Sequence, residues 1–279
     1  MKVYIDAIEW GFSRNEEKDH FFARHTPKNS GCWRNIEMSQ YSEAEWVICF
    51  DSHVRNHHLN KKKILQVRQE PDLIHNYKRI KIADAFLDHE NDVQSIFWFI
   101  NRPFDELNEL KHSDLSSIKK NKCSAIFSNK YTFRNDFFSS ISKELFDIDF
   151  YGRNIESIVG NRRNKGPLTN GLCKIEGLVS YEKSIAIENS SQKNYFTEKL
   201  IDCFMTWTMP IYWGCPNIFE LFPKESIRCI NLDDLDDLKE KIEIPVTKIE
   251  LEAIEEARQL AINKFNFWPA IKRKIDKND

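Results

Sequence analysis

Residues 181–200 read YEKSIAIENSSQKNYFTEKL, and residues 209–218 read MPIYWGCPNI. The apolar run 185–187 predicts a buried parallel strand, and the polar residues 188–191 follow at its carboxyl end. Asn194 is of a residue type that caps helices, so a helix is predicted to begin near it. The later stretch predicts a second strand that ends in a glycine turn. Because open α/β sheets bind ligands beyond the carboxyl ends of their strands, this region predicts a ligand site.

The first turn of the predicted helix contains Thr197, Glu198 and Lys199. A carboxylate at Glu198 is favourable beside the positive end of the helix dipole, whereas the ammonium group of Lys199 is not. An anionic ligand at the helix start would explain the lysine, because helix amides and an ammonium group together bind phosphates. The alternative is that Glu198 is an ordinary first-turn acid and Lys199 a solvated surface residue.

Both halves of the chain alternate short apolar runs with polar or helical segments. The first half predicts strands at residues 3–5, 46–50 and 64–67. The second half predicts strands at residues 124–127 and 148–151, ahead of the stretch quoted above. Alternation of this kind indicates an α/β fold with two Rossmann-like halves.

The quoted stretch resembles the family-ten glycosyltransferases, the α-1,3/α-1,4-fucosyltransferases. The family pattern Tyr-Lys-Phe-x-x-x-Phe-Glu-Asn-Ser corresponds to residues 181–190, and Tyr-Val-Thr-Glu-Lys corresponds to residues 195–199. The family's Pro-x-x-x-Gly strand end corresponds to residues 209–214. Residues 124–138 are similar to an upstream family segment in which a helix carries an arginine on the donor diphosphate. Arg134 occupies the position of that arginine.

The resemblance implies a GT-B glycosyltransferase, in which two Rossmann-like domains face each other across a cleft. We place an acceptor-side domain at residues 1–118. We place a nucleotide-sugar-binding domain at residues 119–279, with a C-terminal helix that could cross back to the first domain.

The resemblance also implies an inverting transfer of L-fucose from GDP-fucose to a hydroxyl of a glycan acceptor. Arg134 and Lys199 would stabilise the departing diphosphate, so that no cofactor is required, although a divalent cation could stimulate the reaction. Glu198 would accept hydrogen bonds from ribose or sugar hydroxyls. The other substrate-binding candidates are Tyr195, Asn189, Thr197, Ser190 and Glu188. Tyr195 could instead be a packing residue and Asn189 a turn former.

The family's catalytic base is a glutamate that follows a strand of the N-terminal domain. Glu70 is the best candidate, because it follows the predicted strand at residues 64–67 and precedes Pro71. Partial burial in a cleft would raise the pKa of such a carboxyl, which suits a base. A loop glutamate without a catalytic role is the alternative, and Asp51 is the second candidate for the base.

Other charged clusters favour structural roles. Residues 147–149 have the Asp-x-Asp form of metal-dependent transferases, but Asp149 is predicted inside a strand. The acidic residues 233–237 suit the start of a helix. The histidines within residues 53–58 lack a third metal ligand at a suitable spacing. The basic residues 162–165 are interpreted as a surface loop, with contact to phosphate or to an acidic acceptor as the alternative.

Composition limits the remaining functional classes. A net charge of −2 over 279 residues lacks the excess of positive charge that is typical of nucleic-acid-binding proteins. No apolar run is long enough for an integral membrane span, which leaves room only for peripheral membrane contact. Seven cysteines without a Cys-x-x-Cys pair predict free thiols. Together with the absence of a secretory signal, they predict a cytoplasmic location. The alternative functions are transfer from another nucleotide sugar and non-catalytic binding of nucleotides or carbohydrates.

Overall fold

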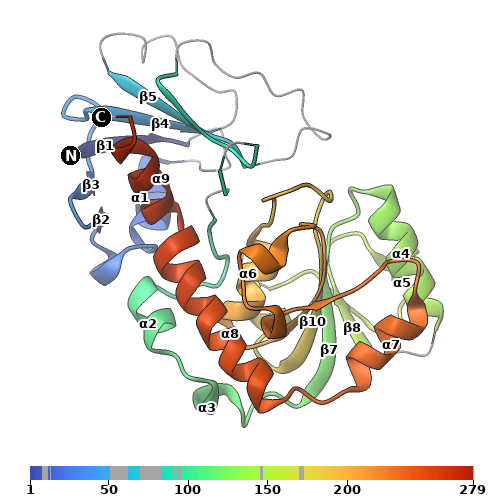
Figure 1. Cartoon of the computed structure of the whole chain (residues 1–279). Coiled ribbons are helices and arrows are strands. Elements are labelled where there is room, and N and C mark those ends of the chain that lie inside the picture. The colour runs from blue at the N-terminus through green and yellow to red at the C-terminus, as the bar shows by residue number, and fades with distance from the viewer. Residues whose placement is uncertain are drawn as a thin grey trace.

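The computed structural model of the chain describes residues 1–7, 12, 14–50, 62–69, 83–90, 92–93, 96–144, 147–169 and 173–278. Within these residues the fold is carried by two six-stranded sheets (Figure 1). Strands of the first sheet come from the N-terminal part of the chain, and strands of the second sheet begin at Asn121. The last strand of the first sheet ends at Leu87. The domain limits at residues 118 and 119 stay a prediction, and they fall between these two strands.

The first sheet contains β1 (Lys2–Asp6), β2 (Cys32–Trp33), β3 (Ile36–Met38), β4 (Trp46–Phe50), β5 (Lys63–Val67) and β6 (Ala85–Leu87). Its order is β2-β3-β1-β4-β5-β6, and its described pairings are parallel except for that of β2 with β3. Every residue of β4 is buried, as expected for a strand covered on both faces. The three strands predicted in this half of the chain are confirmed as parts of β1, β4 and β5.

The second sheet contains β7 (Asn121–Ile126), β8 (Ile148–Tyr151), β9 (Asn164–Gly166), β10 (Tyr181–Ile187), β11 (Met209–Trp213) and β12 (Arg228–Cys229). Its order is β12-β11-β10-β7-β8-β9. From β7 the chain continues to β8 and β9 on one side, and from β10 it continues to β11 and β12 on the other. Such a reversal between two adjacent parallel strands leaves a crevice at their carboxyl ends, where ligands bind. The crevice lies beyond the ends of β7 and β10.

The helices are α1 (Asn15–Ala23), α2 (Phe104–Glu109), α3 (His112–Leu115), α4 (Thr132–Lys143), α5 (Glu156–Val159), α6 (Glu198–Met205), α7 (Leu235–Glu243), α8 (Lys248–Leu260) and α9 (Phe267–Asp276). Apart from its first two residues, α6 is buried throughout, and it packs against β10, β11 and α8. Apolar side chains of α4, α5 and α7 share a core with β7, β8, β10 and β11. The start of α6 is therefore held rigidly against the second sheet.

The C-terminal helices join the two halves of the molecule. In Figure 1, α8 runs from the second sheet toward the first, and α9 lies beside α1 and the first sheet. The backbone of Ile96 accepts from Phe267 and donates to Phe265, both at 3.0 Å. The indole Nε1 of Trp268 donates to the backbone oxygen of Phe22 at 2.9 Å. One hydrophobic core accordingly extends from the first sheet through α6, α8 and α9.

Two further expectations concern thiols and membrane insertion. All seven cysteines are unpaired, which confirms the predicted free thiols; the cytoplasmic location stays a prediction. Within the described ranges, none of the helices combines the length and the apolar character that crossing a bilayer demands.

Candidate active site

A cleft of about 1030 Å³ is lined by both halves of the molecule. The first half contributes side chains of α1 and of residues 96–101, many of them aromatic. The second half contributes residues that follow β7, the start of α4 and the segment from β10 to α6. The cleft thus includes the crevice at the ends of β7 and β10.

Arg134 lies in the first turn of α4 and is only 2% exposed. Its Nη1 donates to Asn189 Oδ1 at 2.9 Å, and its Nη2 donates to the backbone oxygen of Ser128 at 3.1 Å. Its guanidinium carbon lies 4.8 Å from the centre of the Tyr131 ring. Burial lowers the pKa of Arg134, and Tyr131 and Glu188 oppose that shift. An arginine nevertheless remains charged in proteins, so these contacts fix a positive charge across the ends of β7 and β10.

The helix after β10 begins later than predicted. Asn194, the predicted N-cap, has a φ of 60°, which asparagine tolerates but which an N-cap residue does not adopt. The observed cap is Thr197, whose Oγ1 accepts a hydrogen bond from the backbone N–H of Lys199 at 3.3 Å. The prediction that the helix begins near Asn194 is therefore wrong, and the first helical residue is Glu198.

Glu188 is fully buried beneath this cap. Its two carboxylate oxygens accept hydrogen bonds from the backbone N–H and the Oγ1 of Thr197, both at 2.7 Å. Burial raises the pKa of Glu188, and the charge of Lys199 opposes that rise. A Cβ atom on Gly214 would lie 2.5 Å from Glu188 Cγ, so only glycine leaves room for this carboxylate. Glu188 positions the start of α6 and does not line the cleft.

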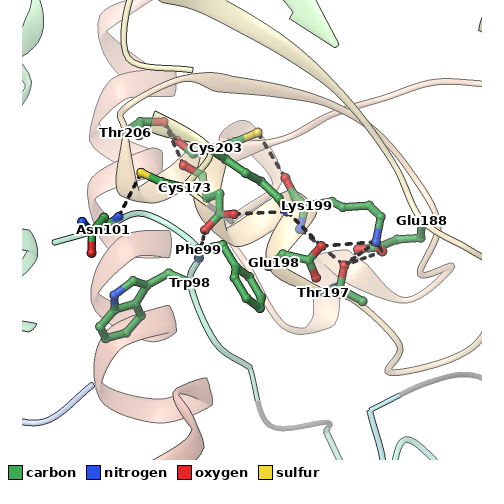
Figure 2. A network of polar contacts seen from close by, with 12 residues as sticks. Trp98, Phe99, Asn101, Cys173, Glu188, Thr197, Glu198, Lys199, Cys203 and Thr206 are labelled. Carbon is green, nitrogen blue, oxygen red and sulfur yellow. Dashed lines mark hydrogen bonds and ion pairs between the residues drawn. The ribbon is translucent and has the colours of Figure 1, made fainter. Parts of the chain in front are cut away.

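Lys199 lines the cleft beside Thr197 and Glu198. Its Nζ lies 3.1 Å from Thr197 Oγ1, 3.4 Å from Glu188 Oε2 and 3.6 Å from Glu198 Oε1. Figure 2 shows its side chain reaching toward Thr197 and Glu188. The side chain is 17% exposed. The ammonium group is thus held at the start of α6 by two carboxylates and still faces the cleft.

Lys174 is a site residue that the sequence did not indicate. Its Nζ lies 2.8 Å from Glu198 Oε1 and 3.3 Å from Asp202 Oδ2, one helical turn apart on α6. Burial disfavours its charge, but these two carboxylates raise the pKa of Lys174. Burial likewise disfavours the charge of Glu198, yet Lys174 and Lys199 hold the pKa of Glu198 well below its usual value. The Glu198 carboxylate is therefore ionised and fixed in place before any ligand binds.

Asp202 connects this ion pair to the first half of the molecule. It is fully buried, and its Oδ1 accepts a hydrogen bond from the backbone N–H of Phe99 at 2.8 Å. The backbone N–H of Lys174 donates to the Phe99 oxygen at 2.8 Å, and that of Asn101 donates to Cys173 Sγ at 3.3 Å. Burial raises the pKa of Asp202 to about 7. Residues 99–101 are thereby tied to α6 (Figure 2).

The predicted site residues fall into three groups. Six of them line the cleft together: Arg134, Asn189, Tyr195, Thr197, Glu198 and Lys199. Glu188 and Ser190 are buried and do not line it. The two candidates for the base, Glu70 and Asp51, lie outside the described residues, as does the histidine group within residues 53–58.

The Asp-x-Asp group at residues 147–149 and the basic residues 162–165 are engaged with each other. Asp149 is buried in β8 and accepts a hydrogen bond from the Tyr181 hydroxyl at 2.9 Å. Arg163 and Lys165 lie 3.3 Å and 3.5 Å from its carboxylate oxygens. Part of the predicted basic loop forms the edge strand β9. No group of three or more metal-ligating side chains occurs among the residues with described positions.

We expect Thr197→Ala to lower the free energy of unfolding by about 1–2 kcal/mol. The substitution removes the cap of α6 and one hydrogen-bond donor to the buried Glu188. Thr197→Ser keeps the hydroxyl and should retain most of the stability. Chemical denaturation of both variants measures the effect, and an alanine variant as stable as the parent would contradict the capping role.

Comparison with known protein families and curated proteins shows which sequences this chain resembles. Residues 116–244 match the model described as glycosyltransferase family 10 (fucosyltransferase), C-terminal. An alpha-(1,3)-fucosyltransferase of Helicobacter pylori is 29% identical over 140 residues, which cover 50% of this chain and 25% of that protein. An Arabidopsis thaliana protein described as fucosyltransferase-like is 32% identical over 91 residues, covering 33% of this chain and 16% of that protein. The chain thus spans a quarter or less of the length of these relatives.

Solved structures show the same architecture at low sequence identity. An alpha1,3-fucosyltransferase matches 92% of this chain and 82% of its own, with a TM-score of 0.52 and 17% identity. Anabaena HepE, solved with UDP-glucose, matches 99% of this chain and 98% of its own, with a TM-score of 0.57 and 8% identity. These likenesses confirm the predicted GT-B fold, and the family match confirms the predicted resemblance. Residues 116–244 therefore resemble the C-terminal domain of glycosyltransferase family 10, and the chain has a GT-B fold.

Proposed function

We propose that this chain is an inverting glycosyltransferase that moves L-fucose from GDP-fucose to a hydroxyl of a glycan acceptor. One observation carries the proposal: Arg134 and Lys199 line the same cleft at the switch point of the second sheet. Both residues lie inside the segment that matches family 10. Two fixed cations, each in the first turn of its own helix, suit the negative charge that grows on a leaving diphosphate.

The proposed reaction is a single displacement. The acceptor oxygen attacks the anomeric carbon while the bond from that carbon to the diphosphate oxygen breaks, and the acceptor proton passes to a carboxylate. Arg134 would bind the diphosphate through its planar guanidinium, and Lys199 would bind it as a point charge. Glu198, which Lys174 keeps ionised, would accept hydrogen bonds from ribose or fucose hydroxyls. Fixed cations make this stabilisation available without a metal ion.

The choice of donor rests on the family match. An alpha1,3-fucosyltransferase of the same fold has been solved with GDP-fucose, at a TM-score of 0.50. HepE has the same fold and was solved with UDP-glucose, so the fold alone accommodates both nucleotides. The family-10 match and the fucosyltransferase relatives favour the guanine nucleotide and fucose.

Thermal unfolding in the presence of GDP, UDP, ADP, CMP or dTDP tests the donor. A ligand present at one hundred times its dissociation constant stabilises the folded state by about 2.7 kcal/mol. We expect GDP and GDP-fucose to stabilise the protein and the other nucleotides to have much smaller effects. Thermal stabilisation by UDP or dTDP alone would contradict the assignment of GDP-fucose as the donor and would favour another nucleotide sugar.

Glu70→Gln tests the catalytic base. The amide cannot accept the proton, so transfer should fall by a factor of about 10² or more, whereas the affinity for GDP should not change. Glu252→Gln, an exposed substitution on α8, is the matched control. Normal turnover by Glu70→Gln would contradict the assignment of Glu70 as the catalytic base and would make Asp51 the next candidate. Binding of GDP-fucose by the parent chain without transfer or hydrolysis would instead favour a non-catalytic binding protein.

A further inference from the structure

The opposite wall of the cleft carries a cation for which the proposed reaction has no role. Arg24 lies at the C-terminal end of α1 and lines the cleft with Phe21, Phe97 and Phe99. This wall belongs to the first half of the molecule, whereas Arg134 and Lys199 belong to the second. Aromatic faces beside polar groups suit the binding of a sugar ring.

The guanidinium of Arg24 is held in a defined orientation. Its guanidinium carbon lies over the Phe21 ring, 4.8 Å from the ring centre. Its Nη1 donates to Asn101 Oδ1 at 3.1 Å. Asn101 belongs to the segment that Asp202 and Cys173 tie to the second half of the molecule. Arg24 is thus a preorganised group on the first wall of the cleft.

The positive charge of Arg24 lacks a carboxylate partner in the described part of the chain. No carboxylate oxygen there lies within 4.0 Å of its nitrogens, and its Nε is buried without a hydrogen-bond acceptor. The negative end of α1 offsets about half a unit of charge. Burial lowers the pKa of Arg24. Cys173 and, to a smaller extent, Asp202 oppose that shift, and Asp202 is already paired with Lys174. Arg24 is partly buried, and a partly buried charge without an ionic partner carries a cost that an anionic ligand would offset.

We propose that Arg24 binds an anionic group of the acceptor, so that the preferred acceptor is an acidic glycan that carries a carboxylate or a phosphate. The inference rests on the proposed function, because it assigns the acceptor side of the same cleft. A planar guanidinium matches both groups through paired hydrogen bonds, and the phenylalanines of the same wall would contact the sugar ring.

Binding of matched sugars to the GDP-saturated protein tests the inference. Glucuronate and glucose differ in one carboxylate, and glucose 6-phosphate supplies the phosphate arm. Dissociation constants are measured by ligand-observed NMR for the parent chain, Arg24→Gln, Arg24→Lys and the control Arg102→Gln. Arg102 is a neighbouring arginine that lies outside the cleft and pairs with Glu106 at 3.8 Å.

We expect the parent chain to bind an acidic sugar at least about tenfold more tightly than glucose. Arg24→Gln should abolish that preference, Arg24→Lys should retain part of it, and Arg102→Gln should retain all of it. Preference for glucuronate would identify the anionic group of the acceptor as a carboxylate, and preference for glucose 6-phosphate would identify it as a phosphate. Equal binding of all three sugars by the parent chain would overturn the inference, and so would an acidic preference that survives Arg24→Gln.

The same experiment separates this inference from the proposed function. Titration of each protein with GDP alone reports on the donor site, and Arg24→Gln should leave that affinity unchanged. If GDP binds and the acidic preference is absent, only the acceptor assignment fails. If GDP does not bind but Arg24→Gln removes an acidic preference, the donor proposal fails and the anion site remains.

Discussion

Replacing Lys199 with methionine is expected to lower the rate of sugar transfer by a factor of about 10²–10³. The ammonium group lies at the start of α6 and faces the cleft, where the diphosphate would gain negative charge as the glycosidic bond breaks. Stabilisation of that charge acts more strongly on the transition state than on the bound donor. The loss should therefore affect kcat as well as the affinity for the donor, and steady-state kinetics with GDP-fucose measures both.

The substitution also removes the cation that pairs with the buried Glu188 and with Glu198. A loss of activity must therefore be distinguished from a loss of folding. Lys199→Arg retains the positive charge and should keep more activity than Lys199→Met at similar stability. Lys193→Met removes an exposed lysine of the preceding loop and should leave turnover unchanged. A folded Lys199→Met variant with the turnover of the parent chain would show that the leaving group does not depend on this residue.

Replacing Lys174 with methionine should destabilise the fold by about 3–5 kcal/mol. The substitution leaves the carboxylates of Glu198 and Asp202 without their shared cation, and both are largely or wholly buried. Adding Asp202→Asn to the same chain should restore part of the loss, because one uncompensated charge then disappears. Urea denaturation of the parent, both single variants and the double variant measures this coupling. Additive effects of the two substitutions would contradict it.

The loss in Lys174→Met should be greater at pH 8 than at pH 5. Without Lys174, the pKa of Asp202 rises further above its usual value, since burial already raises it to about 7 in the parent chain. The folded state then binds a proton that the unfolded state releases above about pH 4, so stability falls as the pH rises through this window. Glu198 adds to the trend, because Lys174 is the main cause that holds its pKa low. A pH-independent difference would exclude these carboxyls as its origin.

The strands and the general position of the site could be predicted from sequence because their signals are local. Apolar runs mark β4 and β11, and the polar residues after β10 mark its carboxyl end. The helix start was misplaced because Asn194 and Thr197 are both residue types that cap helices. The choice between them depends on Glu188, whose carboxylate holds Thr197 through two hydrogen bonds. That contact forms only once β10 and α6 are in place.

Contacts between distant segments account for what sequence could not provide. Lys174 is separated from Glu198 by 24 positions, and Asp202 from Phe99 by 103. Neither pair forms a motif, so an isolated lysine and a buried helical aspartate carried no signal. The same holds for Arg24, which reaches the cleft because α1 packs against residues 96–101. The assignment of Glu70 as the base depends on the family resemblance and stays a prediction.

We propose that Arg134 and Lys199 together hold the diphosphate of the donor. Calorimetric titration with GDP and with guanosine isolates the contribution of the diphosphate to binding. We expect the parent chain to bind GDP far more tightly than guanosine, and Arg134→Gln combined with Lys199→Met to remove most of this difference while the protein stays folded. A folded double variant that retains the parent's preference for GDP would contradict the claim.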